Sequence, residues 1–157
     1  MDAIRFVLNG REVSYEGSAS DRLLDVLRDN YRTTSVKCGC KEGECGACSV
    51  LIDGILINSC CVAIGAVDGS SIVTMEGFRE TKRYMVLDQA FAEVSAVQCG
   101  FCIPGMVLAA EALLTKNAHP TEEEIREGLS GNLCRCTGYN AIINAVSNAA
   151  KEGNGLW

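Results

Sequence analysis

Apolar and polar residues alternate in short runs along the first part of the chain, a pattern that predicts β-strands joined by tight turns. Residues 4–8 (IRFVL) and 11–15 (REVSY) flank Asn9 and Gly10, a dipeptide typical of the type I′ hairpin turn. A further strand is expected at 71–76 (SIVTME). The opening pattern therefore predicts an antiparallel hairpin and a later strand of the same sheet.

Between these strands the pattern predicts one helix and a second hairpin. Ser20 is a candidate N-cap, and the leucines that follow it share one helical face: Leu23, Leu24 and Leu27. The segment 48–60 (CSVLIDGILINSC) places two apolar runs around an Asp-Gly turn. The first half of the chain is therefore expected to be a small mixed sheet with one helix.

After Gly77 the spacing of apolar residues changes to that of amphipathic helices. Helical spacing is found in four segments: 86–97, 104–114, 121–129 and 139–150. Pro104 suits the first turn of a helix, and Thr121 with Glu124 forms a capping-box pattern. We therefore predict an α+β chain with one domain at 1–77 and an all-α domain at 78–157, the boundary lying within 77–84.

Composition narrows the class of protein. The net charge of −6 argues against a nucleic-acid or anionic-membrane partner, which would require a basic patch. No apolar run approaches the roughly 20 residues needed to span a bilayer, and no signal peptide is visible, so we expect a cytoplasmic protein. Each half is so small that a hydrophobic core alone is only marginally stabilising, so we expect an additional stabilising cross-link in each.

The chain contains ten cysteines and a single histidine, His119, and these residues indicate the kind of cross-link. Clustered cysteines in a reducing compartment favour metal ligation over disulfides, and one histidine argues against mixed Cys/His zinc sites and Rieske clusters. From Cys40 the sequence reads C-x4-C-x2-C through Cys45 and Cys48, the spacing of plant-type ferredoxins. Either Cys60 or Cys61 could supply the fourth ligand.

A second set of cysteines lies in the helical half, in QCGFC at 98–102 and CRC at 134–136. Two such pairs, each at a helix end, could converge when the helices pack. A structural zinc ion held by four thiolates stays open for this set. A thioredoxin-like dithiol is disfavoured because the flanking segments are helical.

Four motifs in order, CKEGECGACSV, NSC, QCGFCIPGMV and LSGNLCRCTGY, closely resemble the iron–sulfur subunit of the molybdenum hydroxylases, the xanthine dehydrogenase family. The resemblance spans nearly the whole chain. It implies a β-grasp, plant-ferredoxin-like domain followed by a four-helix-bundle domain, each holding one [2Fe–2S] cluster. The implied ligands of the first cluster are Cys40, Cys45, Cys48 and Cys60, with Cys60 preferred because the family cysteine follows Asn-Ser. The implied ligands of the second are Cys99, Cys102, Cys134 and Cys136.

The resemblance also implies partners. Gln98 and the region of Cys136 are expected to approach the molybdopterin of a large partner subunit, and a medium subunit is expected to hold FAD. Electrons would pass singly from molybdenum through the two clusters to FAD during hydroxylation of an N-heteroaromatic substrate. Nicotinate is the substrate we favour, as in nicotinate dehydrogenase. The alternatives within the family are xanthine, carbon monoxide, aldehydes and hydroxybenzoyl-CoA, and the chain itself is not expected to be catalytic alone.

The remaining candidate residues receive structural interpretations. Glu44 is expected to be a solvated loop carboxylate, and His119 a surface residue ahead of a helix cap. Cys38 and Cys61 are expected to be small buried packing residues. The end of the chain, Leu156-Trp157, is interpreted either as a disordered end or as an anchor on a neighbouring subunit. The rival functions are a zinc-stapled interaction protein and a free-standing ferredoxin-like carrier.

Overall fold

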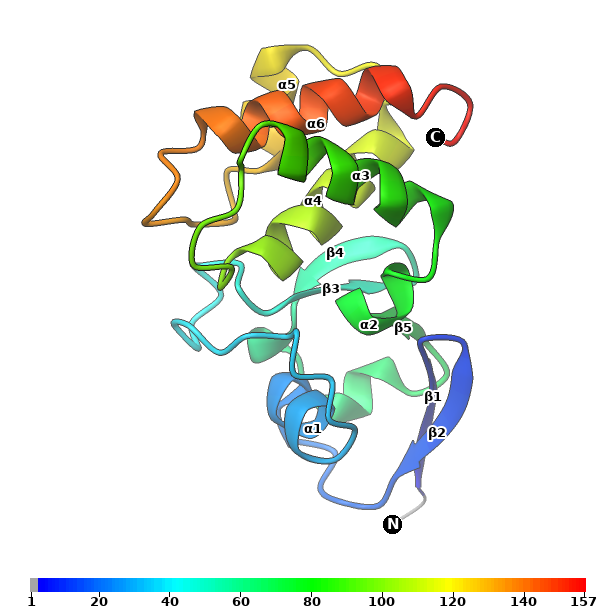
Figure 1. Ribbon diagram of the computed structural model, residues 1–157. Coiled ribbons are helices and arrows are strands. Elements are labelled where there is room, and N and C mark those ends of the chain that lie inside the picture. Colours follow the sequence, from blue (N-terminus) through cyan, green and yellow to red (C-terminus); the bar gives the residue numbers. More distant parts are fainter. Residues whose placement is uncertain (1–2) are drawn as a thin grey trace.

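A computed structural model describes residues 3–157 of the chain (Figure 1). The strands are β1 (Ile4–Leu8), β2 (Arg11–Tyr15), β3 (Ser49–Ile52), β4 (Ile55–Asn58) and β5 (Ser71–Val73). The helices are α1 (Leu23–Asp29), α2 (Met75–Phe78), α3 (Lys82–Glu93), α4 (Ile103–Lys116), α5 (Glu122–Gly128) and α6 (Asn140–Glu152). The predicted α+β order, a sheet region followed by helices, is confirmed.

The strands form one mixed sheet in the order β2-β1-β5-β3-β4. Strand β1 pairs antiparallel with β2 and parallel with β5, and β3 pairs antiparallel with β4 and β5. Both predicted hairpins are present. Their turn residues have positive φ at both central positions, with 51° and 80° at Asn9 and Gly10 and 50° and 80° at Asp53 and Gly54, as the type I′ geometry requires.

Helix α1 covers one face of the sheet, but Ser20 does not cap it. The helix begins at Leu23, with Arg22 at the N-cap position and no side-chain capping bond. The prediction for Ser20 was wrong because its hydroxyl bonds instead to that of Ser18, in the turn before the helix. The leucine face was read correctly, since Leu23, Leu24 and Leu27 are all fully buried.

The last strand is shorter than predicted. Strand β5 ends at Val73, and Met75 already belongs to α2. The predicted strand at 71–76 was wrong in its second part because Met75 and Phe78, three residues apart, both bury their side chains among the helices of the second half. A strand continued through Met75 would turn Phe78 away from that position, since strand side chains alternate between faces.

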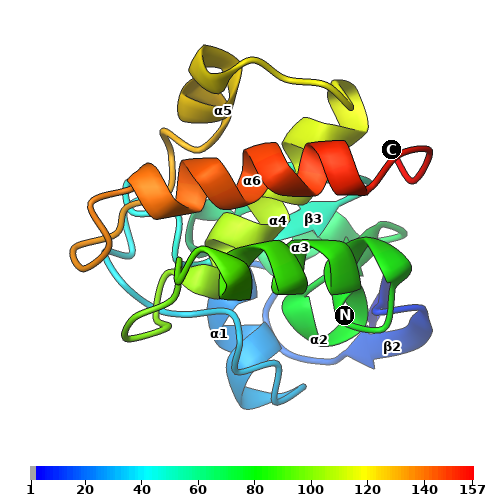
Figure 2. The same ribbon diagram turned by 45° about the horizontal axis from the view of Figure 1, so that its top comes forward.

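Helices α3 to α6 pack together beyond the sheet (Figure 2), and α3 lies against α6. Helix α3 begins four residues before the predicted segment because the Thr81 hydroxyl accepts a hydrogen bond from the backbone N–H of Tyr84. The predicted capping box is present, with reciprocal bonds between Thr121 and Glu124. Pro104 lies in the first turn of α4, as expected. No helix within residues 3–157 is long and apolar enough to cross a membrane.

Strand β3 joins the two halves because its two faces belong to different cores. Val50 and Ile52 are buried with α1 in the first core, whereas Leu51 is buried with α2 to α6 in the second. Alternation of side chains along a strand places Leu51 on the opposite face from its neighbours. The division at 77/78 stays a prediction. Strand β3 belongs to the first half of the chain and contributes side chains to both cores.

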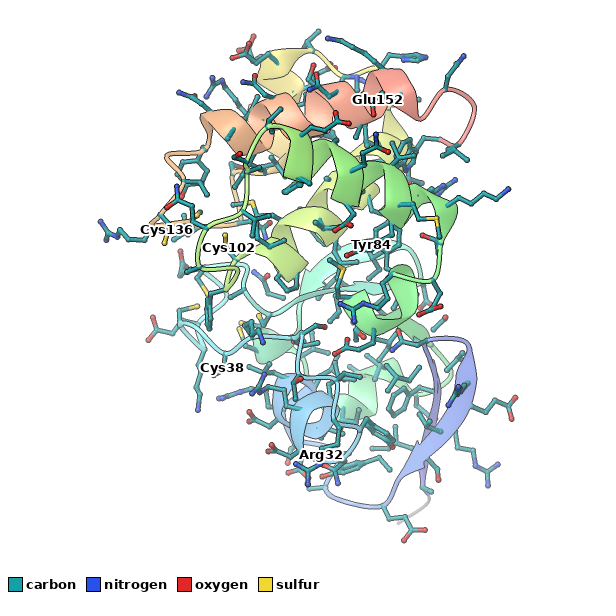
Figure 3. All side chains as sticks on the ribbon, viewed as in Figure 1. Arg32, Cys38, Tyr84, Cys102, Cys136 and Glu152 are labelled. Atoms are coloured by element: carbon teal, nitrogen blue, oxygen red, sulfur yellow. The ribbon has the colours of Figure 1, made fainter. Side chains whose placement is uncertain are left out.

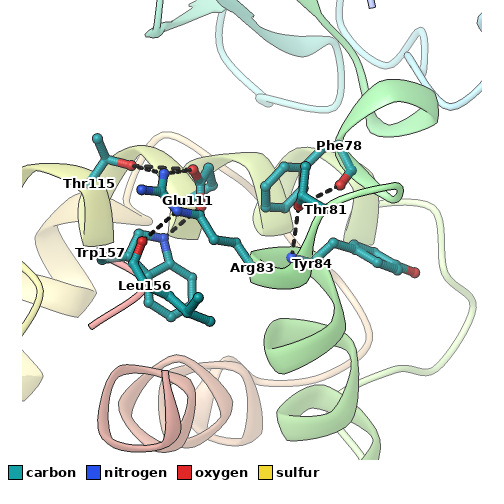
Figure 4. A network of polar contacts seen from close by, with 8 residues as sticks. All are labelled: Phe78, Thr81, Arg83, Tyr84, Glu111, Thr115, Leu156 and Trp157. Carbon is teal, nitrogen blue, oxygen red and sulfur yellow. Dashed lines mark hydrogen bonds and ion pairs between the residues drawn. The ribbon is translucent and has the colours of Figure 1, made fainter. Parts of the chain in front are cut away.

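The end of the chain folds back onto its own helices (Figure 4). The indole N–H of Trp157 donates to the Glu111 carboxylate at 2.7 Å, and the Leu156 carbonyl accepts from Arg83 Nε at 2.7 Å. Arg83 also pairs with Glu111 at 2.8 Å. The interpretation of the tail as a disordered end was wrong, because a buried carboxylate on α4 and a cation on α3 hold it. Its interpretation as an anchor on a neighbouring subunit stays a prediction.

Candidate metal centres

The first candidate centre is the loop between α1 and β3. Gly43 and Gly46 have φ of 78° and 68°, a left-handed conformation that favours glycine. The chain thereby turns back on itself, and three backbone N–H groups point at Cys40 Sγ, from Glu42, Glu44 and Cys45, at 3.3–3.4 Å. These hydrogen bonds lower the pKa of Cys40 to about 6, which favours the thiolate needed to bind metal.

Cys45 lies beside Cys40, with Cys45 Sγ accepting the backbone N–H of Cys40 at 3.4 Å. Cys48 and Cys60 form the other pair of this centre. Cys60 sits in a short 3-10 turn, Ser59–Cys61, directly after β4, and both thiols are buried. Burial foremost, together with the neighbouring Cys60 thiol, raises the pKa of Cys48 to about 12, so a bound metal would be needed to hold it deprotonated.

The two remaining cysteines of this region behave differently from each other. Cys38 is half-buried and packs against the first core, in line with its interpretation as a packing residue. Cys61 is exposed, with its Sγ 3.7 Å from that of Cys60. Its predicted role as a small buried residue was wrong, because the 3-10 turn directs adjacent side chains to different sides. Glu44 and His119 are exposed, as expected.

The second candidate centre brings together two loops distant in sequence. Cys99 and Cys102 precede α4, and Cys134 and Cys136 lie in the loop before α6. Cys136 Sγ lies 3.5 Å from Cys99 Sγ, and their hydrogen bond is the foremost cause that raises the pKa of Cys136. Figure 3 shows Cys102 and Cys136 close together at one side of the molecule. The predicted convergence of the two motifs is therefore present.

Cys102 and Cys134 are the inner pair of this centre. Burial, and then the neighbouring Cys134, raise the pKa of Cys102 to about 12. Burial also acts to raise the pKa of Cys134, but hydrogen bonds from the Thr137 hydroxyl and backbone N–H outweigh it and lower that pKa to about 7. The Thr137 hydroxyl lies 3.1 Å from Cys134 Sγ.

The outer rim of the second centre is open to solvent. Cys99, Cys136 and Gln98 are exposed, and two large apolar side chains stand beside them, Phe101 at 47% and Leu133 at 56% exposure. These residues other than Gln98 line a hollow of about 690 Å³. Gln98 directly precedes Cys99, so it lies at the mouth of the site rather than in its interior.

The two candidate centres are in direct contact through the backbone. The N–H of Leu133, the residue before Cys134, donates to the carbonyl of Cys45 at 2.9 Å. Asn132, which is 3% exposed, donates to the Gly46 carbonyl at 2.9 Å and to the Ser49 hydroxyl at 3.2 Å. Asn132 is not among the site residues predicted from the sequence, where it is visible only as a polar side chain inside the LSGNLCRCTGY motif.

The donor set of each centre suits a two-iron cluster. Among residues 3–157, no three cysteine, histidine or carboxylate side chains converge as closely as a single metal ion requires. Each centre instead offers two pairs of neighbouring thiols, and a [2Fe–2S] cluster takes four thiolates, two on each of its irons. The residues present therefore fit such a cluster.

Comparison with known proteins agrees with this architecture. Residues 6–68 match a family described as a 2Fe-2S iron-sulfur cluster binding domain, and residues 74–147 match a [2Fe-2S] binding domain. The nicotinate dehydrogenase small FeS subunit of Eubacterium barkeri is 51% identical over 149 residues, 95% of each chain. The xanthine dehydrogenase iron-sulfur-binding subunit of Escherichia coli O157:H7 is 43% identical over 150 residues, 94% of each chain.

A solved structure shows the same fold. The crystal structure of quinoline 2-oxidoreductase from Pseudomonas putida 86 includes a chain that superposes with a TM-score of 0.90 at 38% identity, over 97% of this chain and 94% of that one. Fold and donor sets thus define a two-domain protein with two [2Fe–2S] clusters. More particularly, the chain belongs to the small iron–sulfur subunits of the molybdenum hydroxylase family.

Proposed function

We propose that this chain relays electrons one at a time within a cytoplasmic complex that also contains a molybdopterin-binding large subunit and an FAD-binding medium subunit. The order of transfer is from the molybdenum centre to the C-terminal cluster, then to the N-terminal cluster and FAD. The reaction served is hydroxylation of an N-heteroaromatic substrate. Nicotinate is favoured because the relative with 51% identity is a nicotinate dehydrogenase subunit, and xanthine is the alternative.

The proposed ligands are the two pairs at each centre. Cys40 and Cys45 with Cys48 and Cys60 would hold the N-terminal cluster, and the second set would hold the other: Cys99 and Cys136 with Cys102 and Cys134. Each cluster, when bound, takes up and gives away a single electron at a time. The chain contributes thiolates, hydrogen bonds to their sulfurs, and partial burial, the three features by which proteins tune such clusters.

The observation that carries the relay is the contact between the two cysteine loops. The carbonyl of Cys45 accepts the N–H of Leu133 at 2.9 Å, and Leu133 is covalently attached to Cys134. One hydrogen bond therefore joins a proposed ligand of one cluster to a residue adjoining a proposed ligand of the other. The buried Asn132 side chain binds the Gly46 carbonyl next to this contact, so hydrogen bonds between the two loops would set the separation of the clusters.

The open rim of the second centre supports its position next to the large subunit. The exposed thiols of Cys99 and Cys136 are bordered by Phe101 and Leu133, and exposed aromatic and aliphatic side chains around a site are typical of interaction surfaces. The first centre has its buried pair, Cys48 and Cys60, on the side of the first core. Cys99 and Cys136 are thus the more exposed thiols, since those proposed for the first centre are half-buried or buried, and the second centre is the one we place next to the large subunit.

The test is anaerobic purification of the native complex, followed by metal analysis, visible spectroscopy and electron paramagnetic resonance (EPR). We expect co-purifying large and medium subunits and two distinct reduced [2Fe–2S] signals, which appear when nicotinate is added. A colourless zinc protein would contradict the proposal. A stable monomer that shuttles electrons without flavin or molybdenum partners would favour the carrier instead, and cluster reduction by xanthine but not by nicotinate would change the substrate.

Gln98 offers a narrower test of the proposed approach to the pterin. Gln98→Ala should slow substrate-driven reduction of the clusters while leaving iron content unchanged, because the side chain is exposed beside Cys99 rather than buried in the fold. Gln89→Ala is the matched control, an exposed glutamine on α3 whose side chain donates to Glu93 on the same helix. Loss of iron from the Gln98 variant would show that its role is structural.

A further inference from the structure

The loop between Cys134 and Tyr139 closes a ring of hydrogen bonds on itself. The backbone N–H of Cys134 donates to the Tyr139 phenol oxygen at 2.8 Å. The backbone N–H of Tyr139 donates to the Thr137 hydroxyl oxygen at 3.3 Å, and that hydroxyl lies 3.1 Å from Cys134 Sγ. The ring therefore returns to the residue at which it began, by way of two side chains.

The chemistry of the groups sets the direction of the last bond. A metal-bound cysteine is a thiolate and has no proton to give. The Thr137 hydroxyl has one proton, and one of its lone pairs already accepts the N–H of Tyr139. The hydroxyl must therefore donate to the sulfur of a ligated Cys134, where a charged acceptor makes the hydrogen bond stronger than one between neutral groups.

The position of this hydroxyl is held from both sides. Tyr139 has φ of 70°, an uncommon conformation for a residue other than glycine. It is the N-cap residue of α6, and its carbonyl accepts the N–H of Ile143 at 2.9 Å. The start of a helix and the bond to Cys134 together fix Tyr139. Tyr139 in turn orients Thr137, which leaves the hydroxyl little freedom to rotate away from the sulfur.

We propose that Thr137 is a positioning residue that raises the reduction potential of the C-terminal cluster through its hydrogen bond to Cys134. Reduction adds one electron to the cluster and moves no proton, so the sulfurs gain negative charge and a hydrogen-bond donor stabilises the reduced form more than the oxidised form. The hydroxyl makes this cluster a better electron acceptor. The inference rests on the proposed ligation by Cys134.

The test compares potentials in the intact complex. Thr137→Val keeps the shape of the side chain and removes the donor, Thr137→Ser keeps the donor, and Thr137→Ala is a second variant without it. Redox titration followed by EPR gives the midpoint potential of each cluster. The N-terminal cluster serves as an internal control in every sample, and the signal lost in Cys134→Ser identifies the C-terminal one.

We expect the midpoint of the C-terminal cluster to become more negative in the valine and alanine variants and to return toward the unmodified value with serine. The expected size is on the order of a tenfold change in its ratio of reduced to oxidised forms at a fixed potential, which equals about 59 mV for a one-electron couple. The midpoint potential of the N-terminal cluster should not change. This selectivity separates a local hydrogen bond from a general change in the protein.

Three results would overturn the inference. An unchanged midpoint in Thr137→Val, or the same shift in Thr137→Ser, would show that the hydroxyl does not tune the cluster. Loss of the C-terminal cluster from both variants that lack the hydroxyl would assign Thr137 to cluster assembly. Absence of [2Fe–2S] signals from the unmodified protein would instead refute the proposed function, so the two failures are distinguishable.

Discussion

Gly105 lies in the first turns of α4, at the point where this helix meets the loop of the first centre. A Cβ placed on Gly105 would lie 2.5 Å from the carbonyl oxygen of Gly46, between Cys45 and Cys48, and 3.0 Å from Nδ2 of Asn132. Gly105→Ala therefore tests whether the close approach of α4 to the cysteine loop is necessary. In an ordinary exposed helix the same change stabilises by roughly 0.5–1 kcal/mol.

The steric cost of the added methyl group should outweigh this gain in helix stability. An ordinary carbon–oxygen contact begins near 3.4 Å, so helix and loop would have to separate by about 0.9 Å. The Gly46 carbonyl cannot retreat freely, because it accepts hydrogen bonds from Ser49 and Asn132. Overpacking of this kind costs about 1–3 kcal/mol, and a weakened buried hydrogen bond adds roughly 1 kcal/mol. After the helix gain is subtracted, we expect a net destabilisation of roughly 1–3 kcal/mol.

The assay is thermal unfolding followed by circular dichroism, with cluster content measured on the same samples. For a chain of this length, each kcal/mol should lower the midpoint by about 2–4 °C. The N-terminal cluster should be lost first on mild heating, since Gly46 belongs to its loop. Gly128→Ala is the matched control: the three atoms nearest to its added Cβ all belong to the side chain of Leu113, the closest at 3.1 Å, and a side chain can move aside.

A Gly105→Ala protein as stable as the unmodified one would refute this reasoning. It would mean that the two halves can separate by nearly an ångström without loss, and that the contact between the cysteine loops is not fixed. Equal destabilisation by Gly128→Ala would also refute it, because the effect would then follow from any added methyl group at a helical glycine.

Two further predictions concern the ligands and the end of the chain. Cys60→Ala should remove the N-terminal cluster whereas Cys61→Ala should leave both clusters, because Cys60 is buried beside Cys48 and Cys61 is exposed. Visible absorption and EPR measure the cluster content of each variant. The reverse outcome would make Cys61 the ligand. Glu111→Gln should destabilise by roughly 1–2 kcal/mol, less than a fully buried ion pair because the Arg83 side chain is 37% exposed. Urea unfolding and tryptophan fluorescence would show this with cluster content unchanged, and an unaltered unfolding midpoint would contradict it.

Several features followed from the sequence because they depend on neighbouring residues. The Asn-Gly and Asp-Gly turns require positive φ at both positions, and the structure has it at both. The capping box of α5 involves residues three apart, and its bonds are present. The spacing of Cys40, Cys45 and Cys48 is likewise local, and the loop brings the N–H groups to the sulfur as such spacing allows.

Other features needed the tertiary structure. Cys60 and Cys61 are adjacent, and only the turn after β4 decides which one faces Cys48. The ordered end of the chain could not be predicted because its partners, Arg83 and Glu111, lie 73 and 46 residues before the residues they hold. No local pattern reports a contact at such a distance.

The sequence by itself determined the types of element, the two cysteine sets and the family, because turn chemistry, hydrophobic period and ligand spacing act over a few residues. The tertiary structure decided how the halves meet: Leu51 turning to the second core, Asn132 buried against the Gly46 carbonyl, and Leu133 bonded to Cys45. The hydrogen bonds of Asn132 and Leu133 join segments more than eighty residues apart. They arise only when the sheet and the helices pack, since burial then forces each backbone polar group to find a partner.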